Sequence, residues 1–132
     1  MKKELEIALR KLRNASARLR EGAGAIHDTL DKDGVIQRFE FTFELVWKSL
    51  KIMMEHLGKG AECRSPRDCF KAAFRIGLIE DEPVWLQMLD DRNRTSHLYD
   101  EAECEKILKH VQEVYLPAIE KTLALLEQKA KA

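Results

Sequence analysis

Apolar residues recur at intervals of three and four positions along most of this chain, which is the spacing of helices that bury one face. The first such run extends from about Lys3 to about His27. Its apolar face carries Leu5, Ala8, Leu9, Leu12, Ala15 and Leu19, together with the small Ser16. No segment is typical of a strand, and only 6 glycines and 3 prolines interrupt the 132 residues. We therefore predict an all-α fold, an antiparallel four-helix up-and-down bundle with an additional short helix, in one domain spanning 1–132.

The second predicted helix covers about Val35 to about Leu57, after a turn at residues 31–34 in which Asp33 is the expected N-cap. Its main apolar face carries Ile36, Phe39, Phe43, Val46, Trp47, Leu50, Met54 and Leu57. Phe41, Leu45 and Ile52 fall on the opposite face. A helix that is apolar on two sides is either central in the bundle or shared with another chain. We predict that these three residues contribute to a homodimer interface.

Glu40, Glu44 and Lys48 follow one another at steps of four along this second helix. Such spacing favours charge pairing along the helix, worth about 0.3–0.5 kcal/mol per pair. A metal site is the weaker alternative, because no histidine lies at matching spacing. We expect no metal and no cofactor.

Three further helices follow. Ser65 and Pro66 are the expected N-cap and first residue of a helix that ends near Gly77, with Cys69, Phe70, Ala73 and Phe74 facing inward. Residues 80–83 are the acidic, proline-bearing start of the next helix. Asp100 is the expected cap of a last helix from about Glu101 to about Gln128, and Pro117 should kink it.

Charge and cysteine content narrow the class of protein. The 23 basic and 23 acidic residues cancel, which argues against non-specific nucleic-acid binding by a wholly basic surface. Three cysteines without a CxxC pair predict reduced thiols, with a structural zinc site or a disulfide as alternatives. No apolar signal region or membrane-length apolar stretch is present, so we predict a cytoplasmic protein that does not associate with a membrane.

The polar segment 92–100 differs from the amphipathic helices around it. It places Arg92, His97 and Tyr99 at short fixed spacing, and its candidate supporting residues are Asp90, Asp91, Asn93, Arg94 and Ser96. Arginine can stabilise a phosphate, and histidine can transfer a proton near neutral pH, so Arg92 and His97 are candidate catalytic residues. Spacing alone favours a structural alternative, in which Arg92 or Arg94 pairs with Asp90, Asp91 or Asp100. We interpret His27, His56 and His110 as isolated surface or half-buried residues.

The geometry of this segment limits how it could act. In a continuous helix, Arg92 and His97 would point ~140° apart, so they converge only with a break near residues 95–96 or with a second chain. Metal-independent RNA cleavage by 2′-hydroxyl attack needs a base, an acid and a cation at the phosphorus centre. One chain supplies one histidine here, whereas a symmetric dimer supplies two at a composite site.

Residues 35–48, the sequence Val-Ile-Gln-Arg-Phe-Glu-Phe-Thr-Phe-Glu-Leu-Val-Trp-Lys, lie upstream of Trp85 and of the triplet Asp91-Arg92-Asn93. Together with the pattern Arg92-x4-His97-x-Tyr99, they resemble the nucleotidyltransferase substrate-binding protein family of the HEPN superfamily. The resemblance covers nearly the whole chain. It implies an all-helical homodimer and a separately encoded minimal nucleotidyltransferase as partner. The chain lacks a Gly-Ser loop followed by paired aspartates, so it should not transfer nucleotides itself.

The resemblance implies two functions. In one, the chain is an RNase toxin that uses Arg92 and His97, and its nucleotidyltransferase antitoxin adenylylates Tyr99. In the other, it is the non-catalytic substrate-binding subunit of a two-chain nucleotidyltransferase. A module that only docks a partner is a third alternative.

Overall fold

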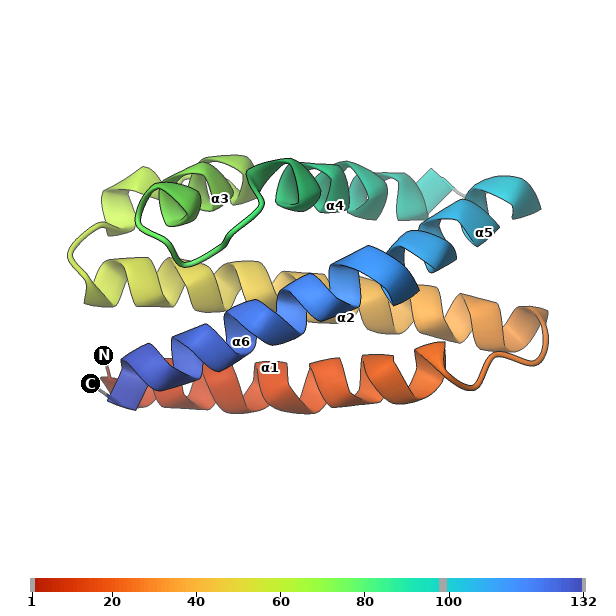
Figure 1. Cartoon of the computed structure of the whole chain (residues 1–132), viewed down its shortest axis with the longest axis horizontal. Coiled ribbons are helices and arrows are strands. Elements are labelled where there is room, and N and C mark those ends of the chain that lie inside the picture. The colour runs from red at the N-terminus through yellow and green to blue at the C-terminus, as the bar shows by residue number, and fades with distance from the viewer. Residues whose placement is uncertain (1, 98–99, 132) are drawn as a thin grey trace.

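In a computed structural model, which describes residues 2–97 and 100–131, all regular structure is helical (Figure 1). The α-helices are α1 (Lys2–Ala23), α2 (Thr29–His56), α3 (Pro66–Arg75), α4 (Glu82–Arg94), α5 (Glu101–His110) and α6 (Leu116–Lys131). Two short 3-10 helices, η1 (Gly60–Glu62) and η2 (Thr95–His97), and a π-helix, η3 (Val111–Tyr115), complete the described elements.

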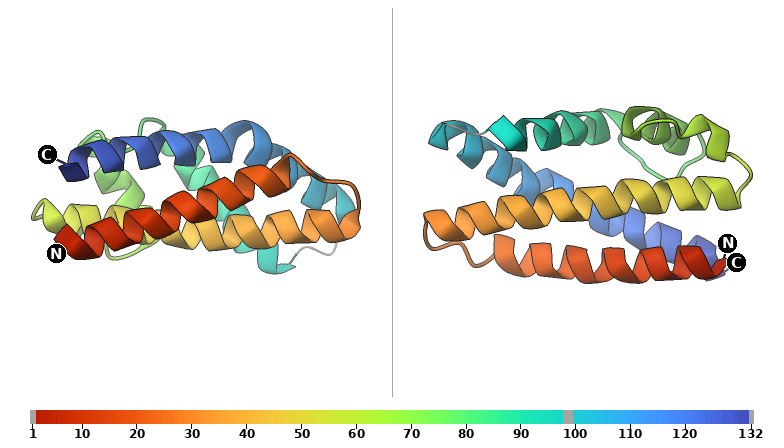
Figure 2. Two further views of the ribbon diagram at one scale, coloured as in Figure 1. Left: turned by 90° about the horizontal axis from the view of Figure 1, so that it is seen from below. Right: turned by 180° about the vertical axis from the view of Figure 1, so that it is seen from behind.

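The helices form four rods, namely α1, α2, α3 followed by α4, and the run from α5 through η3 to α6 (Figures 1 and 2). The beginning of α1 and the end of α6 lie at one end of the bundle. The loop between α1 and α2 and the start of α5 lie at the other end, where Lys32 pairs with Glu101 and Glu105. The arrangement confirms the predicted all-α bundle.

A chain of aromatic rings runs through the core and ties four elements together. Phe39 of α2 stacks on Tyr115 of η3 at a centroid distance of 5.7 Å. Phe43 meets Phe70 of α3 edge-on at 5.9 Å, and Phe70 lies 5.2 Å from Trp85 of α4. All five rings are at most 2% exposed, and such pairs contribute about 0.5–1.5 kcal/mol each beyond area burial. Aromatic packing therefore fixes α4 against α2 and η3.

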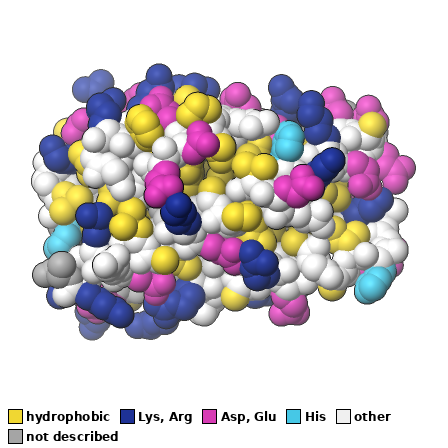
Figure 3. Space-filling view, viewed as in Figure 1, with side chains coloured by type: hydrophobic (Ala, Val, Ile, Leu, Met, Phe, Trp, Pro, Cys, Tyr) yellow, Lys and Arg dark blue, Asp and Glu magenta, His cyan; other side chains and the backbone are white. Residues whose placement is uncertain are grey.

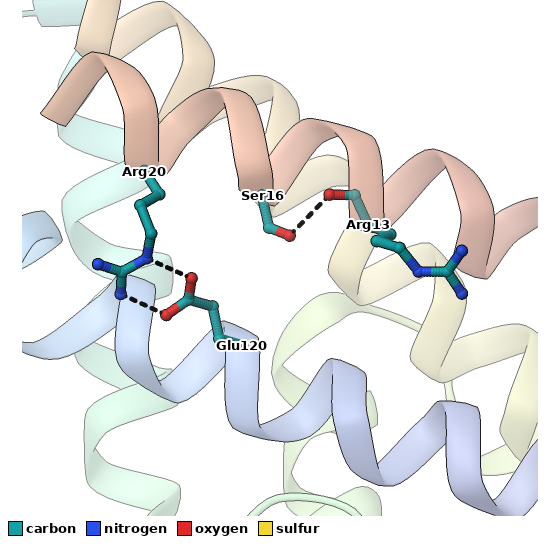
Figure 4. A network of polar contacts seen from close by, with 4 residues as sticks. All are labelled: Arg13, Ser16, Arg20 and Glu120. Atoms are coloured by element: carbon teal, nitrogen blue, oxygen red, sulfur yellow. Dashed lines mark hydrogen bonds and ion pairs between the residues drawn. The ribbon is translucent and has the colours of Figure 1, made fainter. Parts of the chain in front are cut away.

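One polar contact in Figure 4 joins α1 to α6, and another lies within α1. Arg20 donates from Nε and Nη2 to the two carboxylate oxygens of Glu120, at 2.6 and 2.5 Å. The buried Ser16 hydroxyl donates to the carbonyl of Arg13, 3.1 Å away, on the face where a small residue was predicted. Because Arg20 is largely exposed, its pair with Glu120 fixes geometry more than it adds stability.

The boundary between the first two helices differs from the prediction. α1 ends at Ala23 rather than near His27, between two glycines that weaken its last turn. α2 begins at Thr29, so the predicted turn at residues 31–34 is helical and Asp33 is not the cap. Asp28 is the cap instead, because it accepts the N–H of Asp31 while the Asp31 carboxylate accepts the N–H of His27. This reciprocal capping outweighs the turn signal of Asp33 and Gly34.

The later helix starts agree with their sequence signals. Ser65 accepts the N–H of Asp68 at the start of α3, and Asp100 accepts the N–H of Ala102 at the start of α5. Phe74, predicted to face inward from α3, is instead 41% exposed. The deformation before Pro117 takes the form of the π-helix η3, in which the N–H of Leu116 bonds to the carbonyl of Val111.

The surface carries charges of both signs. Figure 3 shows Lys and Arg side chains interspersed with Asp and Glu over the face in view. Within residues 2–97 and 100–131, no helix is long and apolar enough to cross a membrane. The same residues contain no cluster of three potential metal-ligating side chains. The three cysteines are free thiols, and burial raises the pKa of Cys69, whose sulfur lies 2.8 Å from that of Cys63.

Candidate functional site

The predicted break between Arg92 and His97 is present. α4 ends at Arg94, and the N–H of Thr95 bonds to the carbonyls of both Asp91 and Arg92, which tightens the chain into η2. A 3-10 helix turns by about 120° per residue rather than ~100°, so three such steps leave His97 about 160° around the axis from Arg92. The turn therefore does not bring the two side chains together within one chain. His97 is exposed at the end of η2.

Arg92 lies in a groove of about 920 Å³ between α1, α2 and α4. The other residues that line this groove are Lys11, Asn14, Ala15, Arg18, Gly34, Gln37, Arg38, Glu40, Phe41 and Glu44. Four basic side chains, counting Arg92, thus face two acids and the exposed ring of Phe41. The Nε atom of Arg92 is buried and has no hydrogen-bond partner among the described residues. His97 is not among the residues that line the groove.

Glu40 contacts the end of α4, which the sequence did not indicate. The Thr95 hydroxyl lies 2.7 Å from Oε2 of Glu40 and 2.6 Å from the carbonyl oxygen of Arg92. The predicted pairing at steps of four is present only between Glu44 and Lys48, at 3.4 Å. Glu40 and Thr95 are 55 positions apart, so no local pattern could have revealed the contact.

Asp91 faces a different side of α4, about 100° around the helix axis from Arg92. Its side chain is buried, with Oδ2 2.8 Å from Nδ1 of His110 and bonded to the hydroxyl of Tyr115. An ionised carboxylate only accepts hydrogen bonds, so the imidazole and the phenol donate. Burial, followed by the bond to Asp91, raises the pKa of Tyr115. The prediction that His110 is isolated is therefore wrong, and Asp91 anchors α4 to α5 and η3.

The structural alternative, in which a motif arginine pairs with a nearby acid, is not what the described residues show. Asp90 lies 3.5 Å from Arg67 of α3, Asp91 binds His110 and Tyr115, and Asp100 caps α5. The remaining predicted supporting residues, Asn93, Arg94 and Ser96, are exposed. Tyr99 lies outside the described residues.

The three residues predicted at a dimer interface differ in exposure. Phe41 is 62% exposed at the edge of the groove. Leu45 and Ile52 are half-buried and pack against the core of their own chain. Of these three residues, Phe41 therefore offers the most exposed apolar surface to a second chain.

The chain matches the model of a known protein family. A family model described as "Nucleotidyltransferase substrate binding protein like" matches residues 3–128. The chain belongs to this family. The match includes Glu40, Arg92 and His97, so the whole candidate site lies inside the family domain.

Individual proteins of known sequence or structure are also similar to the chain. A Haemophilus influenzae protein named "Probable ribonuclease HepT" is 35% identical over 94 residues, which cover 67% of this chain and 62% of the relative. A crystal structure of a Thermus thermophilus protein is 30% identical and superposes with a TM-score of 0.74, covering 92% of this chain and 99% of that one. A Haemophilus influenzae structure, described as the fold of a substrate binding domain of a nucleotidyltransferase, is 24% identical with a TM-score of 0.69 over 96% and 99%. At 24% identity, this last structure shows that the two proteins share a fold.

Proposed function

We propose that the chain is the helical partner of a separately encoded minimal nucleotidyltransferase and acts as a HEPN-type toxin, a metal-independent ribonuclease whose active unit is a homodimer. The main support for the proposal is the environment of the Arg92 side chain. Its Nε is buried without a partner among the described residues, and its guanidinium lies in a groove with three other basic side chains. No described side chain thus pairs with this arginine in the groove, and a phosphate is the natural ligand of a guanidinium group.

The chemistry assigns one task to each group. One His97 takes the proton of an RNA 2′-hydroxyl, whose oxygen attacks the adjacent phosphorus. The bond from phosphorus to the 5′-oxygen breaks, and the His97 of the second subunit protonates that oxygen. Arg92 offsets the negative charge that builds up on the phosphoryl oxygens. The products are a 2′,3′-cyclic phosphate and a free 5′-hydroxyl, so atoms and protons balance.

The exposed ring of Phe41 supports the dimer. Phe41 and Arg92 line the same groove, so a copy of the chain that covers Phe41 would bring the two sites close together. A two-fold axis there would supply the second histidine that one chain lacks. Replacement of Phe41 by Asp should shift the protein toward monomer in analytical ultracentrifugation and lower RNA cleavage in parallel. A monomeric wild-type protein that cleaves RNA would contradict the dimer.

The central test is RNA cleavage in EDTA by protein purified without its partner. His97→Ala and Arg92→Ala should each lose about 10²–10⁴-fold of the cleavage rate on a labelled single-stranded RNA. His27→Ala is the matched control, because His27 is exposed on the loop before α2 and outside the groove. Cleavage by His97→Ala at the wild-type rate, or no cleavage by the wild type, would refute the proposal.

Regulation by the partner is the second part of the proposal. The nucleotidyltransferase would transfer an adenylyl group to Tyr99, two residues after the candidate general base His97, and block the site. Mass spectrometry of protein co-expressed with the partner should find the modification on the peptide that contains Tyr99. The buried Tyr115 is an internal control, since its hydroxyl is bonded to Asp91 and should stay unmodified. A Tyr99→Phe variant should remain toxic in the presence of the partner.

A substrate-binding subunit of a two-chain nucleotidyltransferase is the alternative function. The groove of about 920 Å³ favours it, since its size suits a small molecule, and a structural neighbour is described as such a domain. In that case the partner should transfer nucleotide to a small acceptor only when this chain is present. Arg92→Ala should then raise the KM for that acceptor, and Tyr99 should stay unmodified.

A further inference from the structure

The junction between α4 and η2 is held by a hydroxyl with two competing acceptors. Thr95 has one hydroxyl proton, while a carboxylate oxygen of Glu40 and the carbonyl oxygen of Arg92 lie 2.7 and 2.6 Å from its Oγ1. Both distances are typical of O–H···O hydrogen bonds. The bond to the Arg92 carbonyl is local to the chain, whereas Glu40 comes from α2, 55 positions away. Glu40 therefore provides the long-range contact that ties this junction to the bundle.

The position of Glu40 on α2 is well defined. Its neighbour Phe39 is fully buried and stacks on Tyr115. Thr42, two positions later, is also buried, and its hydroxyl lies 2.7 Å from the carbonyl of Arg38 and 3.3 Å from that of Ala15 on α1. The backbone that carries Glu40 is thus fixed on both sides, so the carboxylate can hold Thr95 in one place.

The next acid along the groove has a different role. Glu44 accepts from Nε1 of Trp47 at 3.3 Å and pairs with Lys48 at 3.4 Å, both within its own helix. Glu40 instead reaches out of its helix to the residue where the chain changes from α-helical to 3-10 geometry. That change lies between Arg92 and His97, so its geometry decides how the two side chains are directed relative to each other.

We propose that Glu40 is a positioning residue that, through the Thr95 hydroxyl, fixes the α4–η2 junction and thereby the direction of His97 relative to Arg92. The inference rests on the proposed function for its catalytic consequence, but the positioning itself can be measured without any RNA. Glu40 does not touch the reacting atoms in this scheme. It acts on them through Thr95 and the short 3-10 turn.

Two pairs of variants separate positioning from general stability. Glu40→Ala and Thr95→Val remove the contact, whereas Glu40→Gln keeps an acceptor oxygen and Thr95→Ser keeps the hydroxyl. Thr122→Val is the control, because it removes a buried threonine hydroxyl that lies 3.4 Å from the carbonyl of Leu78 and does not contact Glu40 or Thr95. Its effect gives the loss expected from weakened packing alone.

The first measurement is nuclear magnetic resonance of the wild type and these variants. Glu40→Ala and Thr95→Val should speed hydrogen exchange of the Thr95 amide about tenfold and shift the ring signals of His97. Glu40→Gln and Thr95→Ser should stay close to the wild type, as should Thr122→Val after correction for its global stability. The double variant Glu40→Ala with Thr95→Val should add little to either single change. Wild-type exchange and ring signals in both contact-breaking variants would overturn the inference.

The second measurement is RNA cleavage. Loss of the contact should lower kcat about tenfold or more with little change in KM, because substrate still binds while His97 is misdirected. Glu40→Gln and Thr95→Ser should recover most of the rate. If the wild type does not cleave RNA, the proposed function fails while the exchange data still decide the positioning role. If the wild type cleaves RNA and Glu40→Ala has wild-type kcat, the positioning role fails alone.

Discussion

Asp91 and Arg92 are neighbours in the sequence but lie in opposite environments. Asp91 is 5% exposed and its carboxylate binds His110 and Tyr115 on the core side of α4. Arg92 faces the groove, about 100° around the helix axis from Asp91, and its buried Nε has no partner among the described residues. Asp91 thus anchors the helix, whereas Arg92 is the candidate ligand-binding residue of the groove. The structural carboxylate and the candidate functional arginine of α4 therefore lie in different surroundings, and substitutions at the two positions should have different effects.

Asp91→Ala should have the largest effect on folding. It removes the acceptor of two donors and leaves the Tyr115 hydroxyl buried beside His110. Each buried donor left without its acceptor costs about 1–3 kcal/mol, and this substitution leaves two. Urea unfolding should show this loss, and Asp91→Asn should lose less because its amide oxygen still accepts. A loss below about 1 kcal/mol in Asp91→Ala would contradict the anchoring role.

Tyr115→Phe should have the next largest effect. It keeps the ring that stacks on Phe39 but removes the hydroxyl, which leaves Asp91 with one donor fewer. We expect a loss of about 1–2 kcal/mol near neutral pH. The variant should also change how the free energy of unfolding depends on pH at high pH. Because the pKa of Tyr115 is raised in the folded state, the unfolded chain ionises first as pH rises above about 10, and stability falls there.

Measurement of the free energy of unfolding between pH 8 and 11 tests whether stability falls as Tyr115 of the unfolded chain ionises. Above about pH 10 the free energy of unfolding should fall more steeply with pH in the wild type than in Tyr115→Phe. The difference in slope should correspond to at most one proton released on unfolding. Equal slopes would show that the Tyr115 phenol contributes nothing to the loss of stability at high pH.

His110→Ala should follow, with a loss of about 1 kcal/mol in urea unfolding. The side chain of His110 is 23% exposed, so water can replace part of its contact with Asp91. His56→Ala is the control, since His56 is exposed at the end of α2 and makes no contact with this network. A loss in His110→Ala no larger than in the control would show that Tyr115 alone holds Asp91.

Much of the fold was predictable because its signals are local. Apolar spacing predicted the helices, and Ser65 and Asp100 each cap the helix that they were expected to cap. The start of α2 was missed because two capping signals compete within six residues, and the reciprocal bonds of Asp28 and Asp31 prevail over Asp33. Only the geometry of the backbone decides between such close alternatives.

The site was predictable only in part, because only some of its features depend on residues close together in the sequence. Arg92 and His97 could be identified because their spacing is a short-range pattern. The contacts of Asp91 with His110 and Tyr115 span 19 and 24 positions, and that of Glu40 with Thr95 spans 55. Helical periodicity does not encode contacts between helices, so these roles became visible only once the helices were packed.

Arg92→Ala should have the smallest effect on folding and one of the largest on function, the reverse of Asp91→Ala. Loss of a buried donor without a partner removes a cost, so the free energy of unfolding should change by less than about 0.5 kcal/mol or rise. RNA cleavage should nevertheless fall about 10²-fold or more, because the cation at the phosphate is lost. Arg92→Lys should keep the charge but recover little of the rate, since lysine lacks the planar fork. If Arg92→Ala instead unfolds the protein as Asp91→Ala is expected to, both faces of α4 are structural, and the division between neighbouring residues does not hold.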